Sequence, residues 1–221
     1  MTDTDPQKTI KVLVISDTHN RHDTLAMDPA DILIHCGDFT MSGRESEVRA
    51  FDAWLAKIAP NYKEIIVIAG NHDFMFQEDP EKARALLTHA TYLEDSGTTA
   101  LGVRIWGSPW TPQFYDWAFM LPRGEMMKAK RDLIPAGLDI LIVHGPPQGI
   151  LDVTTEGVHA GCDELLTAVH LKQPRFCAFG HIHEGRGVLR GQPTTFVNAC
   201  SVDERYQPFG KPILLQIPTL D

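Results

Sequence analysis

The chain has 221 residues and the composition of an ordinary globular protein, with 43% hydrophobic and 22% charged residues. Its formal net charge of −9 at pH 7 disfavours extended nucleic acid and anionic membranes as partners. A small anionic substrate is still compatible with this charge, because a bound metal ion reverses the local sign of a pocket.

The beginning of the chain is polar and acidic, which predicts a disordered tail over residues 1–8, followed by a single domain over residues 9–221. It has no apolar core of the kind that marks a signal peptide, and no apolar run approaches the ~18 residues of a membrane span. The four cysteines form no CxxC pair: Cys36, Cys162, Cys177 and Cys200. We therefore expect a cytoplasmic protein with reduced thiols, mostly in its core.

Short apolar runs alternate with amphipathic segments along the chain. The runs that suit buried strands are residues 10–15, 32–36, 65–69, 138–143 and 175–179. Helical spacing predicts helices after a capping box at residues 42–45, after Asp79-Pro80, and around residues 162–169. Later strand candidates have no helices between them, which favours antiparallel pairing: residues 101–106, 187–189, 194–197 and 213–217. The pattern predicts a mixed α/β fold with two sheets.

Each of the apolar runs in the first group leads directly into a residue that can bind a metal ion. In chain order these residues are Asp17, Asp38, Asn71, His144 and His181. Ligands of open α/β sheets gather outside the carboxyl ends of the strands, so this repetition predicts one shared site.

The first two motifs supply carboxylates. Asp17 and His19 are two residues apart in an extended segment, so both can reach one metal ion. Gly37 permits a close backbone approach, and the two oxygens of Asp38 can bridge two cations. Taken alone, Asp17-Thr-His19 is more typical of a turn, and Asp38 is equally compatible with a helix cap or a turn.

The later motifs supply an amide and imidazoles. Asn71 offers a neutral oxygen, which leaves His72 free to transfer a proton or to stabilise a leaving oxygen. His144 by itself is more typical of a hydrogen-bonded core histidine. His181 and His183 can chelate one metal or serve two neighbouring ones, and the lack of a cysteine pair disfavours a zinc finger.

In this order, the motifs resemble those of the calcineurin-like metallophosphoesterases. The one departure is Val143, which stands where that family has glycine before the histidine of the fourth motif. The chain is most similar to the metallophosphoesterase-domain-containing branch, which includes small cyclic-nucleotide phosphodiesterases. The segments that carry this closer resemblance are residues 37–40, 107–112, 117–119, 144–147, 161–162 and 180–185.

The resemblance implies a four-layer α/β/β/α sandwich, in which two mixed sheets are flanked by helices. It also implies that Asp38 bridges two metal ions and that His72 is the catalytic histidine. The implied ligands of the first ion are Asp17, His19 and His183. Those of the second ion are Asn71, His144 and His181.

The expected activity is hydrolysis of phosphodiesters, cyclic nucleotides among them, by attack of a metal-bound hydroxide on phosphorus. Mixed oxygen and nitrogen ligands admit Mn, Fe, Zn, Co or Ni. Two alternatives stay open: a phosphomonoesterase, and a metal-binding regulatory protein with little activity. The protein phosphatases of the family carry a Gly-Asp-x-Val-Asp-Arg-Gly motif that residues 37–43 lack, which weakens the first alternative.

Candidate substrate contacts lie near two of these motifs. Residues 106–119 are rich in aromatic side chains, which predicts either a lid that stacks a nucleobase or a loop packed by its own side chains. Trp110 is the residue of this segment that we expect to touch a substrate. Arg21, just after the first motif, is positioned to meet a phosphate oxygen or to lie in solvent.

Overall fold

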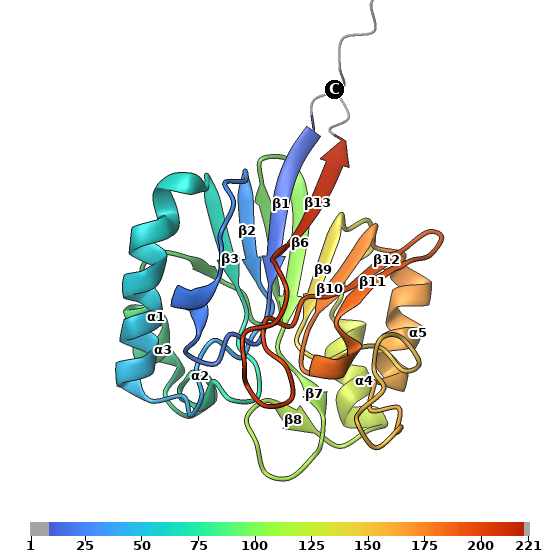
Figure 1. Cartoon of the computed structure of the whole chain (residues 1–221). Coiled ribbons are helices and arrows are strands. Elements are labelled where there is room, and N and C mark those ends of the chain that lie inside the picture. The colour runs from blue at the N-terminus through green and yellow to red at the C-terminus, as the bar shows by residue number, and fades with distance from the viewer. Residues whose placement is uncertain (1–8, 219–221) are drawn as a thin grey trace, which may run out of the picture.

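The computed structural model describes residues 9–218, so the tail predicted at residues 1–8 lies outside the described residues. Two β-sheets lie face to face, and helices cover their outer faces (Figure 1). This arrangement confirms the predicted α/β/β/α sandwich. Within residues 9–218, no helix is both long and apolar enough to cross a membrane.

The first sheet has the strand order β13-β1-β2-β3-β4. Its strands are β1 (Thr9–Ile15), β2 (Ile32–His35), β3 (Glu64–Val67), β4 (Thr91–Tyr92) and β13 (Ile213–Pro218). The pairs from β1 to β4 are parallel, and β13 pairs antiparallel with β1. The carboxyl ends of β1, β2 and β3 therefore lie at one edge, toward the bottom of Figure 1.

The second sheet has the strand order β11-β12-β10-β9-β6-β5. Its strands are β5 (Ser96–Ala100), β6 (Val103–Ser108), β9 (Ile140–Val143), β10 (Phe176–Phe179), β11 (Gly187–Arg190) and β12 (Thr195–Asn198). The predicted antiparallel pairing of the later strands is correct for β5 with β6 and for β11 with β12, which short turns join. It is wrong for the inner neighbours, because β6 and β12 also pair in parallel with β9 and β10. Longer connections separate these inner partners, and such crossovers return a strand in the same direction.

The pleat of the strands divides their side chains between the layers. In β1, Val12 and Val14 pack into the core between the two sheets, whereas Leu13 and Ile15 pack toward the helices. Because both faces are covered, the strands are apolar on both sides, which explains the continuous apolar runs in the sequence.

Three helices cover the first sheet and two cover the second. They are α1 (Glu45–Ile58), α2 (Phe74–Glu78) and α3 (Pro80–Leu86), and then α4 (Glu125–Asp132) and α5 (Asp163–Lys172). Helix α3 begins as predicted, with Pro80 in its first turn and the Asp79 carboxylate accepting the Lys82 N–H.

The predicted capping box at residues 42–45 is displaced. Helix α1 has Arg44 at its N-cap, and the Glu47 carboxylate accepts the N–H groups of Ser42 and Arg44. Gly43 lies between them with φ +66, so the chain turns there and Ser42 stays outside the helix.

Candidate metal centre

The loops at the carboxyl edge of both sheets bring the predicted ligands into one cluster. Asp38 is at its middle, with Oδ2 3.8 Å from His19 Nε2 and 3.3 Å from His144 Nε2. Asp17 lies beside it, with Oδ1 3.5 Å from His183 Nε2. Asn71 and His181 both contact His144. Asn71 Oδ1 lies 2.9 Å from His144 Nε2, and the His181 ring centroid lies 5.0 Å from that of His144.

The backbone at the cluster adopts conformations that few residues favour. Asp17, His19, Asp38 and His181 all have positive φ, between 40° and 68°. Such conformations cost free energy in non-glycine residues and persist where the surrounding structure imposes them. Gly180 permits the approach of Asp17, because a Cβ at that position would collide with its Oδ2.

The two carboxylates are buried without a lysine or arginine partner. Asp17 is 0% and Asp38 is 2% exposed, and within residues 9–218 their ion pairs are with histidines alone. Burial of an anionic group is costly unless a proton or a cation neutralises it. The cluster is therefore suited to hold cations.

Backbone carbonyls orient the imidazoles of this cluster. A carbonyl only accepts hydrogen bonds, so each Nδ1 in such a contact carries the proton and each Nε2 is directed toward the carboxylates. The contacts are His72 Nδ1 with Met41 O at 2.7 Å, His144 Nδ1 with Cys36 O at 2.9 Å, and His183 Nδ1 with Asp203 O at 2.9 Å. When Nε2 is deprotonated, this orientation makes the lone pairs of His144 and His183 available to a metal ion.

Unsatisfied buried atoms also fit a metal centre. Neither ring nitrogen of His19 has a hydrogen-bond partner, although the residue is only 2% exposed. In the part of the chain that the structure describes, potential ligand atoms lie within 4.8 Å of one another in three groups, and Asp38 belongs to two of them. The groups are Asp17 with His183 and Cys200, His19 with Asp38 and His72, and Asp38 with His144 and His181.

The buried carboxylates of Asp17 and Asp38 also shift the pKa values of the neighbouring histidines. Burial by itself would lower the pKa of His144 and His183, but the neighbouring carboxylates of Asp38 and Asp17 raise each pKa to about 9. Burial lowers the pKa of His19 to about 4 and that of His181 to about 3. Each carboxylate thus has one imidazolium partner, whose charge a bound cation would replace.

Asp73 connects the two central loops. Its buried carboxylate accepts the N–H groups of Asp38 at 2.8 Å, Thr40 at 3.0 Å and Gly70 at 2.8 Å, and also the Thr40 hydroxyl at 2.7 Å. Burial and the charge of Asp38 raise the pKa of Asp73 to about 7. The sequence contained Asp73 in the Gly-Asn-His-Asp motif but offered no indication of this role.

Two aromatic residues beside the cluster were not singled out from the sequence. The Trp117 ring centroid lies 4.5 Å from that of His72, and the Tyr206 ring centroid lies 4.8 Å from that of His19. Trp117 was part of the aromatic segment, whereas no local pattern pointed to Tyr206.

The expected substrate contacts have different surroundings. The Trp110 indole N–H donates to Asp95 at 2.9 Å, and the Lys130 ammonium lies 4.3 Å from the centre of its ring. These contacts favour a packing role for Trp110, and its contact with a substrate stays a prediction. Arg21 is exposed two residues after His19, and its contact with a phosphate also stays a prediction.

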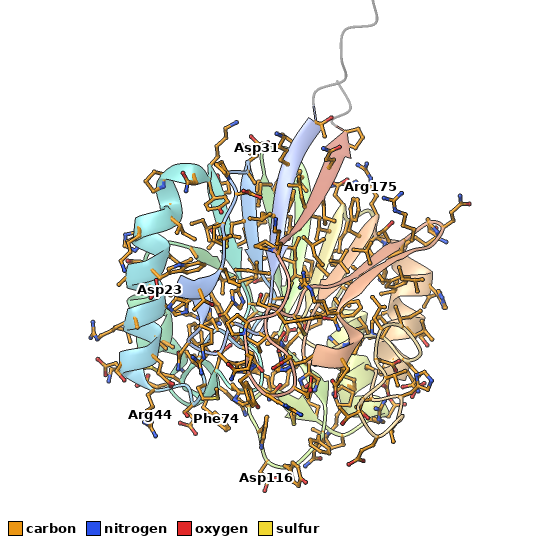
Figure 2. All side chains as sticks on the ribbon, in the orientation of Figure 1. Asp23, Asp31, Arg44, Phe74, Asp116 and Arg175 are labelled. Atoms are coloured by element: carbon orange, nitrogen blue, oxygen red, sulfur yellow. The ribbon has the colours of Figure 1, made fainter. Side chains whose placement is uncertain are left out.

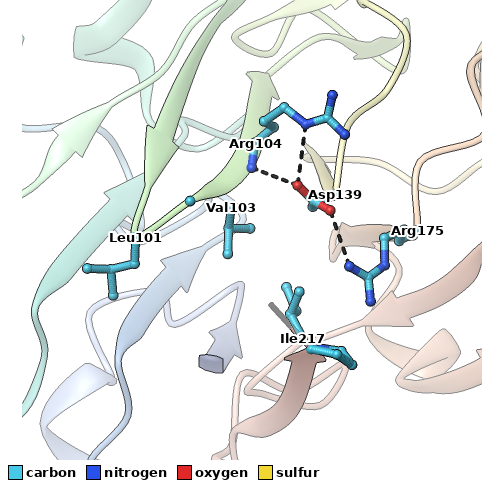
Figure 3. A pocket seen from close by; sticks show the side chains of 8 residues that line it. Leu101, Val103, Arg104, Asp139, Arg175 and Ile217 are labelled. Atoms are coloured by element: carbon cyan, nitrogen blue, oxygen red, sulfur yellow. Dashed lines mark hydrogen bonds and ion pairs between the residues drawn. The ribbon is translucent and has the colours of Figure 1, made fainter. Parts of the chain in front are cut away.

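A cavity of about 340 Å³ lies at the opposite edge of the sheets (Figure 3). Its charged groups are paired with one another, since the Asp139 carboxylate lies 3.6 Å from Arg104 Nε and 3.3 Å from Arg175 Nη1. None of its lining residues belongs to the metal-ligand cluster.

Comparisons with known proteins agree with this geometry. A family model described as calcineurin-like phosphoesterase matches residues 10–185. The human and mouse proteins named metallophosphoesterase domain-containing protein 1 are each 45% identical to this chain, over 95% of it and 71% of their own length. A UPF0046 protein of Caenorhabditis elegans is 36% identical over 95% of this chain and 81% of its own length.

Solved structures share the fold at low sequence identity. One superposes with a TM-score of 0.66 at 18% identity, over 95% of this chain and 100% of that chain. The crystal structure of TT1561 of Thermus thermophilus superposes with a TM-score of 0.55 at 14% identity, over 86% of this chain and 89% of that chain. At such identities the similarity is evidence for the fold alone.

Proposed function

Because this chain belongs to the calcineurin-like phosphoesterase family, we propose that it is a binuclear metal-dependent hydrolase of phosphodiesters, cyclic nucleotides among them. The observation that carries this proposal is the position of Asp38. Its buried carboxylate lies between His19 on one side and His144 on the other, which suits a bridge between two cations.

The proposed ligands divide into two sets that share Asp38. The first set is Asp17, His19 and His183, and the second is Asn71, His144 and His181. The short contacts within each set support this division. Oxygen and nitrogen donors of this kind accept Mn, Fe, Zn, Co or Ni. When bound, two such ions activate water as a nucleophile and neutralise phosphate charge.

His72 is the proposed catalytic histidine. Its Nδ1–H donates to the Met41 carbonyl, so Nε2 is directed toward Asp38, whose Oδ2 lies 4.0 Å away. The side chain is 12% exposed, which leaves one edge accessible from outside. When the His72 ring is protonated at Nε2 as well as at Nδ1, the Nε2 proton would be donated to the leaving oxygen, or would stabilise its developing charge.

The substrate is proposed to be a small phosphate ester in a cytoplasmic setting. The net charge of −9 supports a small ligand rather than an extended nucleic acid. A preference for diesters over monoesters is consistent with residues 37–43, which lack the Gly-Asp-x-Val-Asp-Arg-Gly motif of the family's protein phosphatases.

The test is hydrolysis of bis(p-nitrophenyl) phosphate, p-nitrophenyl phosphate and a panel of cyclic nucleotides by purified protein loaded with Mn²⁺. We expect faster turnover of diesters than of the monoester, with loss of both activities when a chelator removes the metal. A preference for the monoester would overturn the assignment to diesters. Absence of turnover with every ester would overturn the proposal that the protein is a hydrolase.

A further inference from the structure

Two aromatic rings from distant parts of the chain meet the proposed catalytic histidine. The Trp117 ring centroid lies 4.5 Å from that of His72 at an interplanar angle of 79°. The Tyr206 ring centroid lies 6.3 Å from that of His72, and 5.7 Å from that of His183. His72 therefore has both an indole and a phenol among its ring neighbours.

Hydrogen bonds hold Trp117 in place relative to the centre. Trp117 is on the loop between β7 (Thr111–Pro112) and β8 (Met120–Leu121), on which Figure 2 labels Asp116. The next residue, Ala118, donates its N–H to the Asn71 carbonyl at 3.2 Å. Because this bond joins the loop to a proposed metal ligand, Trp117 stays beside His72.

Tyr206 is fixed by a different loop. Its backbone has φ 58, and its N–H donates to the Asp203 carbonyl at 2.9 Å. The same carbonyl accepts the Nδ1–H of His183. The turn that orients His183 therefore also sets the position of the Tyr206 ring.

Both rings have surface available to a ligand. Trp117 is 36% exposed and Tyr206 is partly exposed. Within residues 9–218, the ring contacts of Trp117 and Tyr206 are with imidazoles alone, so neither indole nor phenol is stacked on another phenyl, phenol or indole ring. By contrast, Trp110 packs against Phe119, and Phe114 packs against Tyr115.

We propose that Trp117 and Tyr206 form an aromatic subsite, which binds a flat ring such as a phenyl group or a nucleobase on the leaving-group side of the phosphate. This inference rests on the proposed function, since His72 is assigned to the leaving oxygen there. The group attached to that oxygen must lie near His72, and hence against these two rings. Stacking on aromatic side chains accepts any flat π-face and needs no specific hydrogen bonds.

A matched pair of inert phosphonates tests the subsite without any chemical step. At a pH above the second pKa of both acids, phenylphosphonate and cyclohexylphosphonate have the same charge and nearly the same size, but only the first has a π-face. Calorimetry on the metal-loaded protein should give about tenfold tighter binding of phenylphosphonate. Trp117→Leu should abolish this preference and Trp117→Phe should keep most of it, with bound metal unchanged in both. Tyr206→Leu should reduce the preference for phenylphosphonate over cyclohexylphosphonate.

Tyr115→Leu is the control, because Tyr115 is on the same loop but is 70% exposed and contacts Phe114. This variant should keep the full preference for phenylphosphonate. Equal affinity of the wild-type protein for both phosphonates, or a preference that survives Trp117→Leu, would overturn the subsite while diester hydrolysis still stands. Failure to bind either phosphonate, together with no turnover of any ester, would instead overturn the proposed function on which the subsite rests.

Discussion

The thiol of Cys200 lies against the carboxylate of Asp17, with Sγ 3.3 Å from Oδ2. The backbone N–H of His181 donates to both oxygens, at 2.9 Å to Oδ2 and 3.1 Å to Oδ1, and Oδ1 also lies 3.5 Å from His183 Nε2. The thiol thus contacts only Oδ2, on the side of the carboxylate away from the oxygen that faces His183. We therefore expect Cys200 to act on the centre through Asp17, as a positioning residue.

Cys200→Ala should weaken metal binding about 10–100-fold, as expected for the loss of a group that orients a ligand. Cys200→Ser should retain most of the affinity, because a hydroxyl also donates to Oδ2. Titration against a chelator of known affinity measures this effect. Cys177→Ala is a suitable control, since Cys177 is equally buried but packs in the hydrophobic cluster around α5. Wild-type affinity in Cys200→Ala would exclude the positioning role.

Asp38→Asn should lose bound metal. The amide removes the negative charge that lies between the histidines, and its nitrogen cannot act as a ligand. Elemental analysis after gel filtration gives the metal content per chain. Asp31→Asn provides a matched control, because Asp31 pairs with Lys63 away from the centre. Retention of the wild-type metal content by Asp38→Asn would argue against its place between two ions.

His72→Ala should keep its metal but reduce kcat about 10²–10⁴-fold, which is the usual contribution of a proton-transferring side chain. The measurement is turnover of bis(p-nitrophenyl) phosphate, with metal content determined on the same sample. His89→Ala serves as the control, because His89 is an exposed histidine that pairs with Asp52. A kcat of His72→Ala close to that of the wild-type protein would contradict a catalytic role for His72.

Asp73→Asn should destabilise the fold by about 1–3 kcal/mol, because buried donors lose their acceptor. The carboxylate accepts N–H groups on both oxygens, whereas an amide would direct its own NH₂ toward one of these sets of donors. Urea denaturation gives the change in free energy of unfolding. Asp116→Asn, on the exposed loop between β7 and β8, should change it little, and equal stabilities of the two variants would contradict the connecting role of Asp73.

His22 should make the fold sensitive to acid. It is 3% exposed and packs against Phe51 and Trp54, with ring centroids 5.5 Å and 5.0 Å away. Burial lowers its pKa from 6.5 to about 4 in the folded protein. Between these values the unfolded chain binds the proton more readily, so the stabilisation present above pH 6.5 is lost as the pH falls toward 4.

His22→Leu should therefore lose less stability than the wild-type protein between about pH 7 and pH 4, by up to about 3 kcal/mol. Denaturant unfolding at several pH values measures the difference. His170→Leu, a change at an exposed histidine of α5, should follow the wild-type curve. Parallel curves for His22→Leu and the wild type would show that other groups cause the acid sensitivity.

The fold class and the grouping of the predicted ligands at one edge followed from local sequence patterns. Buried strands need apolar residues on both faces, so their ends were visible where a polar residue interrupts the run, as at Asp17, Asp38 and His144. Parallel strands bring their carboxyl ends to one edge, which is why residues far apart in the chain could be assigned to one place.

Local patterns did not predict which other side chains approach that edge. Cys200 is separated from Asp17 by 183 positions, and no spacing rule extends over such a distance. Trp117 rather than Trp110 lies beside His72, because Trp110 is held by Asp95 and Lys130 while the bond from Ala118 to Asn71 fixes the loop. A local sequence pattern reflects the secondary structure and burial of its own segment. The contacts of Cys200 and Trp117 with the centre join distant segments, so they arise only when the two sheets pack together.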